Sequence, residues 1–511
     1  MNSNGSAPGD ERPLTMTALA AIVAAGAVLR FWALDGGIPY NIGIDEPQVM
    51  NRAVTMMRTG DFNPHFYDYP GLYIYVQVVV SCLRFMAGAA LGEWRSLAEP
   101  ELGDFLLWGR AVTAALGTAT VALVYCIAER WGRRQALLAA GLMAVMPLHV
   151  RESHFVLTDV PVTFFVALAM LVTLRAAERP SPRTFAWAGA AAGLAAGTKY
   201  PGGLAVILPL LAIATTPELR GARGRSFAAV VASAAAVFLL VAPYTLLDLP
   251  GFLNGYAKLM ASYTGPTTGD PGWQVYLKHL RLNIGWPAYA ATVVGCLIAL
   301  VRTVQGPARL RWMLLVVFPL LYVWFISRQT LIFGRYLLPA VPFVCVLAAA
   351  AVVAAAGWLR RVAVPRAART AAVLALTVVV VVPPAISAVR FNVNFARPGT
   401  PGLAHDWIVE NIPEGTSIVY EGSDLSLAHT SYDSHHVGQL RHRPYEYYLE
   451  RGVEYLIASS QRYGEYLEAA KREPGADGGY LRLFELTEEV ARFTPDRENP
   501  GPELRILKIR R

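Results

Sequence analysis

The sequence is poor in charged residues, and only five of its 45 lysine and arginine residues are lysine. Only 16% of its 511 residues are charged, whereas a soluble globular chain carries roughly 25%. Hydrophobic residues make up 54% of the chain, and the mean hydropathy is +0.38. These values exclude a disordered, collagen-like or disulfide-rich secreted chain and indicate a polytopic membrane protein.

Cysteine is also scarce, and the positive charge does not gather on one face. The four cysteines (Cys82, Cys126, Cys296, Cys345) lie in apolar stretches without CxxC spacing, so we interpret them as small core residues. The net charge is +8, but its arginines punctuate apolar runs. We therefore interpret the charge as a membrane topology signal and expect no nucleic-acid partner.

Eleven apolar stretches come close to the roughly 20 residues that a helix needs to cross a bilayer. They are 14–34, 105–128, 135–150, 160–177, 184–199, 201–216, 226–247, 286–303, 311–327, 336–357 and 370–390. Residues 1–13 are polar and precede an apolar run too long for a cleavable signal peptide, so we expect a short disordered cytoplasmic tail. A further apolar stretch, 70–91, is ambiguous.

Arginines in short connections predict the orientation of these spans. Sixteen arginines and three acids fall in 129–134, 175–183, 217–225, 302–311 and 358–369, which predicts all five as cytoplasmic. A span at 70–91 would break this pattern. The simplest prediction is that 35–104, which has nine acids and four bases, forms one long outer segment, with 70–91 along the interface or re-entrant. The alternative is that 70–91 is an ordinary span and one connection breaks the rule.

The last part of the chain, 391–511, is polar, and its apolar runs shorten to strand length. We predict strands at 417–420, 453–458 and 504–509 and helices at 406–411 and 463–472. The predicted fold is an α-helical polytopic membrane domain over 14–390, followed by a small extracytoplasmic α/β domain. The other outer segments are 151–159, the surroundings of Tyr200, 248–285 and 328–335.

Acidic residues lie at predicted outer ends of the spans. Ionisable groups at membrane depth are costly, so they are functional hypotheses by default. Asp45 and Glu46 precede Pro47, and Asp159 stands where an apolar helix begins. Capping of a helix N-terminus is the alternative explanation for all three acids.

Cations lie at the same predicted side. Lys199 ends an apolar helix, and Arg328 and Arg335 flank an outer connection, against the inside bias of basic residues. Phosphate binding would explain them; the alternatives are snorkelling of Lys199 and headgroup anchoring of the arginines. His279 and Arg281, near Trp273 and Tyr276, form either a lid over a site or an interfacial belt.

Acids and cations gathered on one membrane face suit transfer of a sugar from a polyprenyl phosphate. A carboxylate serves as general base for the acceptor hydroxyl, and cations stabilise the departing phosphate. The attack would invert the anomeric carbon, by analogy with glycoside hydrolysis. Asp45, Glu46 and Asp159 are the candidate catalytic residues, and Lys199, Arg328 and Arg335 the candidate phosphate-binding residues. Candidate substrate contacts are Tyr67, Asp68, Tyr69, His154, Tyr200, His279 and Arg281.

The order of short motifs resembles the GT-C glycosyltransferases, in the branch of protein O-mannosyltransferase-like and aminoarabinose-transferase-like enzymes. The motifs are DE at 45–46, YDYPGLY at 67–73, GRAV at 109–112, ERWGRR at 129–134, DVP at 159–161, TKYPG at 198–202 and GRYLLP at 334–339. The resemblance covers about 14–390. The aminoarabinose enzymes have Glu-Lys-Pro where this chain has Asp68, Tyr69 and Pro70, so phosphate contacts of that loop are not carried over.

The resemblance implies a multi-span fold with juxtamembrane helices in the first outer loop, a polyprenyl-phosphate-linked sugar donor and inversion. By position, it implies that Asp45 is the catalytic base, that Asp159 supports the site, and that Lys199 is the lysine of the family's Thr-Lys motif. Arg335 lies where the family has basic residues near the donor phosphate. The acceptor is an unidentified hydroxyl compound, and the membrane is the cytoplasmic (inner) one.

Other functions stay open at this point. A transporter or flippase of lipid-linked glycans would need polar residues along a path through the bilayer. The spans at 201–216, 226–243 and 336–357 hold virtually no ionisable residue, which disfavours ion-coupled transport. A membrane anchor that displays 391–511 as a binding module would need far fewer spans. The three acids could also hold a divalent metal ion through their oxygens, so the cofactor stays unknown.

Overall fold

The computed structural model describes two compact units of the chain. It covers residues 11–38, 45–265, 270–305, 308–362, 365–422, 425, 427, 430–471 and 479–510. The first unit holds the chain up to Trp32, Gln48–Glu99 and Trp108–Phe391, and the second holds Ala33–Pro47, Pro100–Leu107 and Asn392–Arg511. The first ten residues of the predicted tail at 1–13 lie outside the described part.

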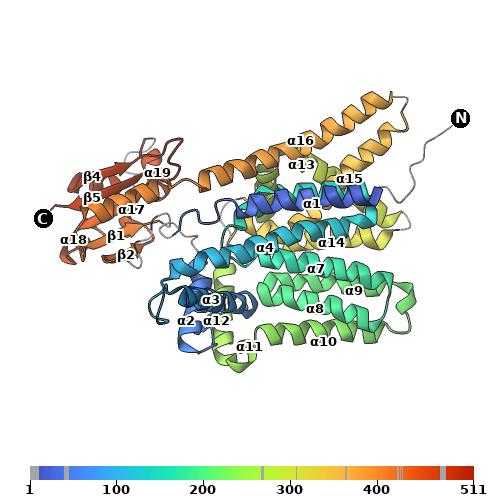
Figure 1. The fold of residues 1–511 in the computed structure, drawn as a ribbon, viewed down its shortest axis with the longest axis horizontal. Coiled ribbons are helices and arrows are strands. Elements are labelled where there is room, and N and C mark those ends of the chain that lie inside the picture. The colour runs from blue at the N-terminus through green and yellow to red at the C-terminus, as the bar shows by residue number, and fades with distance from the viewer. Residues whose placement is uncertain are drawn as a thin grey trace. The chain divides into compact units, whose positions relative to one another are not determined.

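Helices form the chain up to residue 395 (Figure 1). In order they are α1 (Glu11–Phe31), α2 (Glu46–Thr59), α3 (Gly71–Leu91), α4 (Leu102–Ala128), α5 (Arg133–Ala144), α6 (Pro147–Glu152), α7 (Asp159–Glu178), α8 (Pro182–Thr198), α9 (Ile207–Thr215), α10 (Arg223–Val241), α11 (Tyr244–Leu247), α12 (Leu249–Tyr263), α13 (Gly272–Val304), α14 (Arg309–Ile326), α15 (Val341–Leu359) and α16 (Arg366–Phe395). The 3₁₀ helices are η1 (Glu129–Trp131), η2 (Tyr200–Val206), η3 (Pro217–Leu219) and η4 (Gly334–Ala340).

Nine helices in the described ranges are long and apolar enough to cross a membrane, and eight of these match predicted stretches. The other three of the eleven predicted stretches are shorter helical pieces: 135–150 divides into α5 and α6, 184–199 is the 17-residue α8, and 201–216 is η2 followed by α9. The ninth helix is α3, the ambiguous stretch. It is one continuous helix of 21 residues, unlike the interrupted helices of a re-entrant segment.

The segment 248–285, predicted as an outer loop, is mostly helical. Asp248 caps α12 by accepting a hydrogen bond from the backbone N–H of Gly251, and α13 already begins at Gly272. Within α13, Gly285 has a positive φ of 75° and Pro287 follows it. Both features interrupt helical geometry, so the predicted start of the span at 286 coincides with a kink inside a longer helix.

A buried arginine satisfies the backbone where α5 gives way to α6. The Arg30 guanidinium donates hydrogen bonds to the carbonyls of Ala144 and Met143, both at 2.9 Å, and lies 3.1 Å from Nδ1 of His149. Carbonyls freed by a helix break need such internal partners at membrane depth. The break is therefore stable, and it leads the chain through α6 toward Asp159.

Small residues bring α8 against α10. A Cβ added at Gly189 would lie 2.4 Å from the carbonyl oxygen of Val230, and one at Gly193 would lie 2.5 Å from that of Ala234. Glycine is therefore required at both positions, as in other closely packed membrane helices. This packing fixes α8 and with it the position of Lys199 at its end.

The C-terminal part of the second unit is a mixed sheet with helices. Its strands are β1 (Ser417–Glu421), β2 (Asp433–Val437), β3 (Tyr455–Ser459), β4 (Thr487–Phe493) and β5 (Leu504–Ile509), in the spatial order β2-β1-β3-β5-β4. The helices are α17 (Gly399–Asn411), α18 (Tyr445–Glu450), α19 (Ser460–Ala470) and α20 (Tyr480–Leu486), with η5 (Leu440–His442). β1 pairs in parallel with β2 and β3, and β5 pairs antiparallel with β3 and β4.

The predicted small α/β domain is confirmed, and so are its three predicted strands and two predicted helices. Val419 of β1 lies opposite Leu456 of β3, and both are buried. Glu421, at the end of β1, accepts hydrogen bonds from the backbone N–H groups of Leu440 and Ser459 and from the Tyr480 hydroxyl. This buried carboxylate thus ties the strand ends to a neighbouring helix.

Candidate active site

The start of α7, the end of α8 and the helix η4 lie close together in the first unit. Asp159 is the first residue of α7, Lys199 directly follows α8, and Arg335 lies in η4. Helix α8 stops there because Lys199 adopts an extended backbone (φ −154°, ψ 132°) and Pro201 comes two residues later. Charges that are far apart in the sequence are thereby brought together.

The Asp159 carboxylate pairs with two cations. Its Oδ1 lies 2.7 Å from Nζ of Lys199, and its Oδ2 lies 3.7 Å from Nε of Arg335. The Asp159 side chain is 4% exposed, that of Lys199 11% and that of Arg335 19%. Buried charges persist only when paired, so this pairing favours a shared site over snorkelling of Lys199 and anchoring of Arg335.

Aromatic rings surround the Lys199 ammonium. Its Nζ lies 4.5 Å from the ring centroid of Tyr336 and 5.8 Å from that of Tyr69, within range of a cation–π attraction. The Tyr336 and Tyr263 hydroxyls are 2.7 Å apart. Tyr69 was among the predicted substrate contacts. Tyr336 was not, although it follows Arg335 directly in the sequence, and no pattern in the sequence indicated Tyr263.

A second buried carboxyl group, Glu152, accompanies Asp159 and was not among the predicted residues. Its Oε1 lies 2.7 Å from Nη2 of Arg151. Burial raises the pKa of Glu152 above its ordinary value, an effect that the Arg151 charge opposes and the Asp159 charge reinforces. The ion pair of Arg151 with Glu152 at the end of α6 therefore lies near the Asp159 carboxylate at the start of α7.

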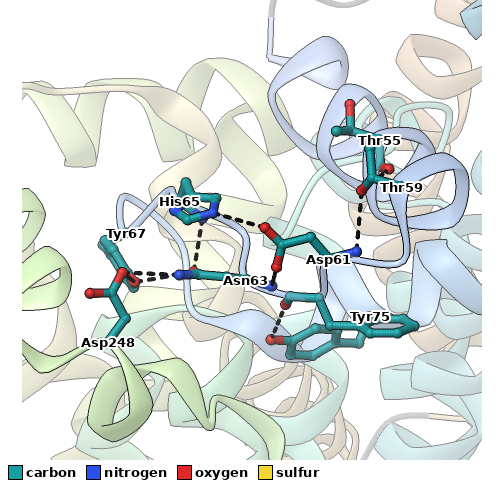
Figure 2. A network of polar contacts seen from close by, with 9 residues as sticks. Thr55, Thr59, Asp61, Asn63, His65, Tyr67, Tyr75 and Asp248 are labelled. Carbon is teal, nitrogen blue, oxygen red and sulfur yellow. Dashed lines mark hydrogen bonds and ion pairs between the residues drawn. The ribbon is translucent and has the colours of Figure 1, made fainter.

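The loop at 60–70 is tied to the start of α12 (Figure 2). The Tyr67 hydroxyl and the Asn63 side-chain amide donate hydrogen bonds to Oδ2 of Asp248, at 2.6 and 3.0 Å. These bonds, that from Tyr67 first, lower the pKa of the Asp248 carboxyl. The Tyr200 hydroxyl donates to the Tyr67 carbonyl at 3.0 Å, so the loop is also anchored next to Lys199.

The same loop carries Asp68 beside a basic residue of α2. The guanidinium of Arg52 lies 3.6 Å from the ring centroid of Phe66. Burial raises the pKa of Asp68, and the positive charge of Arg52 opposes this shift. Tyr67, Asp68, Tyr69 and Tyr200 thus belong to the surroundings of Lys199, as candidate substrate contacts would need to.

The remaining predicted cations and histidines occupy other positions. His279 lies beside Gly334, where an added Cβ would be 3.4 Å from its Nδ1. Arg281 lies over the ring of Trp286 at 4.6 Å, and Arg328 over that of Trp324 at 5.2 Å. These two stackings fit anchoring at an interface better than a place beside Asp159. His279 and Arg281 belong to α13 and not to a loop.

His154 is engaged inside the protein. Its two ring nitrogens lie 2.8 Å from the Val150 carbonyl oxygen and 3.0 Å from that of Trp32, and the residue is fully buried. Phe391 covers the ring edge-on at 5.2 Å. These contacts indicate a packing function for His154.

Asp45 and Glu46 stand at the start of α2. Glu46 is the first residue of the helix and is fully buried, while Asp45 is half-buried. The helix expected after Pro47 is confirmed, and two acids suit its N-terminus electrostatically. Both residues belong to the second unit, so their convergence with Asp159 stays a prediction.

Within the described ranges, no three His, Cys, Asp or Glu residues gather closely enough to hold a metal ion.

Comparisons with known proteins give a match over part of the chain. Residues 102–246, which include Asp159 and Lys199, match the family model of the dolichyl-phosphate-mannose-protein mannosyltransferases. A search of the curated proteins finds no significant match.

Two solved structures are similar over most of their length. ArnT from Cupriavidus metallidurans, bound to undecaprenyl phosphate, has a TM-score of 0.56 and 16% sequence identity, and the match covers 95% of this chain and 97% of ArnT. The second is the oligosaccharyltransferase AglB from Archaeoglobus fulgidus, in complex with an inhibitory peptide and a dolichol-phosphate. It has a TM-score of 0.58 and 14% sequence identity, and the match covers 96% of this chain and 74% of AglB. The chain therefore has the fold of the GT-C membrane glycosyltransferases. Together with the match over 102–246, this fold supports a glycosyltransferase.

Proposed function

We propose that this protein transfers a sugar from a polyprenyl-phosphate donor to a hydroxyl acceptor, with inversion, at the outer face of the cytoplasmic membrane. One observation carries the proposal: Lys199 and Arg335 converge on the Asp159 carboxylate where three membrane helices end or begin. Such a pair of held cations suits a lipid-linked phosphate, whose charge must sit at the membrane surface.

The cations would bind the donor phosphate. Asp159 holds Lys199 and Arg335 by one carboxylate oxygen each, which fixes their positions before the lipid arrives. Fixed charges stabilise a developing anion without the cost of reorganisation. The relatives support this assignment, because ArnT was solved with undecaprenyl phosphate and AglB with a dolichol-phosphate.

Asp45 would be the general base. The acceptor oxygen attacks the anomeric carbon while its proton passes to the Asp45 carboxylate, and the bond from the anomeric carbon to the phosphate oxygen breaks. The electron pair of that bond leaves with polyprenyl phosphate, whose charge Lys199 and Arg335 balance. Attack opposite the leaving group inverts the anomeric centre.

Asp159 would act as a positioning residue. Its two oxygens face Lys199 and Arg335, so its charge balances and positions these two cations. The tyrosines around Lys199 would bind the donor next to its phosphate, with Tyr69 and Tyr336 closest to the ammonium.

The sidedness rests on charge. The five arginine-rich connections predict the cytoplasmic side, and α7, α8 and α15 each join one of these connections to the Asp159 end. Asp159, Lys199 and Arg335 would accordingly face outward, where polyprenyl-linked sugars meet acceptors outside the cell.

The test is turnover of purified protein in lipid with a panel of polyprenyl-phosphate sugars, followed as release of polyprenyl phosphate. Asp45→Asn should reduce turnover at least about a thousandfold, since it removes the base, with thermal stability almost unchanged. Asp35→Asn, an exposed aspartate in the same segment, is the matched control and should keep full activity. Turnover by Asp45→Asn at the wild-type rate would refute the assignment of the base.

A further inference from the structure

The end of the helix bundle opposite Asp159 holds a basic cavity. Helix α7 runs 20 residues from Asp159 to Glu178, and α15 runs 19 residues from Val341 to Leu359. At 1.5 Å per residue each spans about 30 Å, the thickness of a bilayer core. The far ends of α7 and α15 therefore meet the membrane surface predicted as cytoplasmic.

The cavity has a volume of about 570 Å³ and lies between the start of α5 and the end of α15. Arg133 and Arg134 line it from one side, Arg360 lines it from the other, and Trp131 and Gln135 complete the lining. No acidic residue is among the described residues that line it. The nearby Arg130 is already paired with Glu178 at 2.9 Å, so the lining keeps a net positive charge.

A second cavity continues the first. It has a volume of about 250 Å³ and shares Gln135 and Val353 with the basic cavity. Its lining adds Arg302 and the apolar residues Ile298, Ala350 and Ala354. Ile298 is one helical turn before Arg302 on α13, so this lining runs from a charged rim toward apolar membrane depth.

The tryptophan in the basic cavity forms part of its wall. The indole Nε1 of Trp131 is buried and has no acceptor among the described residues. The ring itself is fixed edge-on against Trp312 at 5.4 Å. The Nε1 atom is covered from solvent, so Trp131 contributes a rigid aromatic wall to the cavity and not a hydrogen-bond donor.

We propose that these two cavities bind one anionic phospholipid of the cytoplasmic leaflet. Its phosphodiester would lie between Arg134 and Arg360, and the start of an acyl chain would lie along Ile298, Ala350 and Ala354. Positive charge at the rim and apolar lining below it match the two parts of such a lipid, and basic pockets between membrane helices bind anionic headgroups in this way. A water-soluble phosphate would match only the rim. The proposal is independent of glycosyl transfer.

The experiment measures lipid binding to the full-length protein in neutral detergent, by native mass spectrometry and thermal unfolding. Phosphatidylglycerol should bind in a saturable one-to-one ratio and raise the unfolding temperature, while phosphatidylcholine should bind far more weakly. The double variant Arg134→Gln/Arg360→Gln should bind phosphatidylglycerol roughly thirtyfold more weakly, since each arginine near an anionic headgroup contributes a factor of about five and the two factors multiply.

The matched control is Arg220→Gln/Arg225→Gln, which removes two exposed arginines from another connection on the same predicted side. Equal weakening by both double variants would overturn the proposal, because it would reduce the effect to overall charge. The single variant Arg360→Gln should weaken binding about fivefold. It tests the site even if the double variant folds poorly.

Two further outcomes would contradict the lipid assignment. Glycerophosphoglycerol, the soluble headgroup without acyl chains, should give no stabilisation at the concentration that saturates phosphatidylglycerol. If it stabilises the protein equally, the site binds a free phosphodiester. If phosphatidylglycerol and phosphatidylcholine bind alike, the cavities accept any lipid and the arginines do not select.

Discussion

The two ends of the membrane helices use the same basic side chains in different surroundings. At the Asp159 end, Lys199 and Arg335 are largely buried around one carboxylate. At the other end, the five connections hold sixteen arginines and three acids, and the pair of Arg130 with Glu178 leaves the glutamate side chain 43% exposed. Numerous exposed arginines are predicted to orient the chain, whereas a few buried cations share one acid in the proposed site.

The largest expected difference between the ends concerns activity. Lys199→Gln removes a cation that would stabilise the leaving phosphate, so turnover should fall about a hundredfold to a thousandfold. Thermal stabilisation by added polyprenyl phosphate alone should be lost as well. The matched control is Lys258→Gln, an exposed lysine of α12, which should keep both properties. Equal losses in the two variants would contradict a phosphate-binding function for Lys199.

The next difference concerns stability. Asp159→Asn leaves Lys199 and Arg335 buried without their countercharge and should cost about 3 kcal/mol of the free energy of unfolding. Glu178→Gln breaks the Arg130 pair at the other end, in which the glutamate side chain is 43% exposed, and should cost less than about 1 kcal/mol. Unfolding of both variants in the same lipid measures the contrast. Similar costs would mean that the Asp159 cluster is as solvated as the Arg130 pair.

The smallest expected effect concerns the mobility of the loop at 60–70, which lies at the Asp159 end of the helices. Its two hydrogen bonds to Asp248, from Tyr67 and Asn63, lower the pKa of that carboxyl below the ordinary 3.8 together with a third bond from the Gly251 backbone N–H. Their stabilisation is therefore present above that value and is lost as the pH falls through the lowered pKa. Asp248→Asn should therefore speed hydrogen exchange of the loop amides severalfold at neutral pH. Tyr67→Phe, which removes one donor, should have a smaller effect. Unchanged exchange in both variants would show that other contacts hold the loop.

Much of the fold could be predicted from the sequence, because it depends on local patterns. Apolar runs located the membrane helices, and short alternating runs located β1, β3 and β5. The strand β2 was missed because it lies at the edge of the sheet and is mostly polar, with the sequence Asp-Ser-His-His-Val. The division of 135–150 into α5 and α6 was missed because its stability depends on Arg30, more than a hundred residues earlier.

The candidate site was predictable in part. Asp159, Lys199 and Arg335 stood out because charged residues at the ends of apolar helices are costly and few. Glu152 was missed although it lies in the same outer connection, since its burial follows from packing. Tyr336 and Tyr263 were missed because tyrosines are common near membrane surfaces. No local pattern predicts that their hydroxyls form a hydrogen bond or that Tyr336 contacts the Lys199 ammonium.

By itself the sequence determined that the chain crosses a membrane many times, which connections carry the orienting arginines, and which few charged residues interrupt apolar runs. These properties follow from transfer of single side chains between water and hydrocarbon, so they can be counted along the chain. Only the tertiary structure decided that Lys199 and Arg335 share the carboxylate of Asp159, and that Arg328 lies over Trp324 instead. Pairing depends on distances of a few ångströms between helix ends, which helix packing sets and no local pattern records.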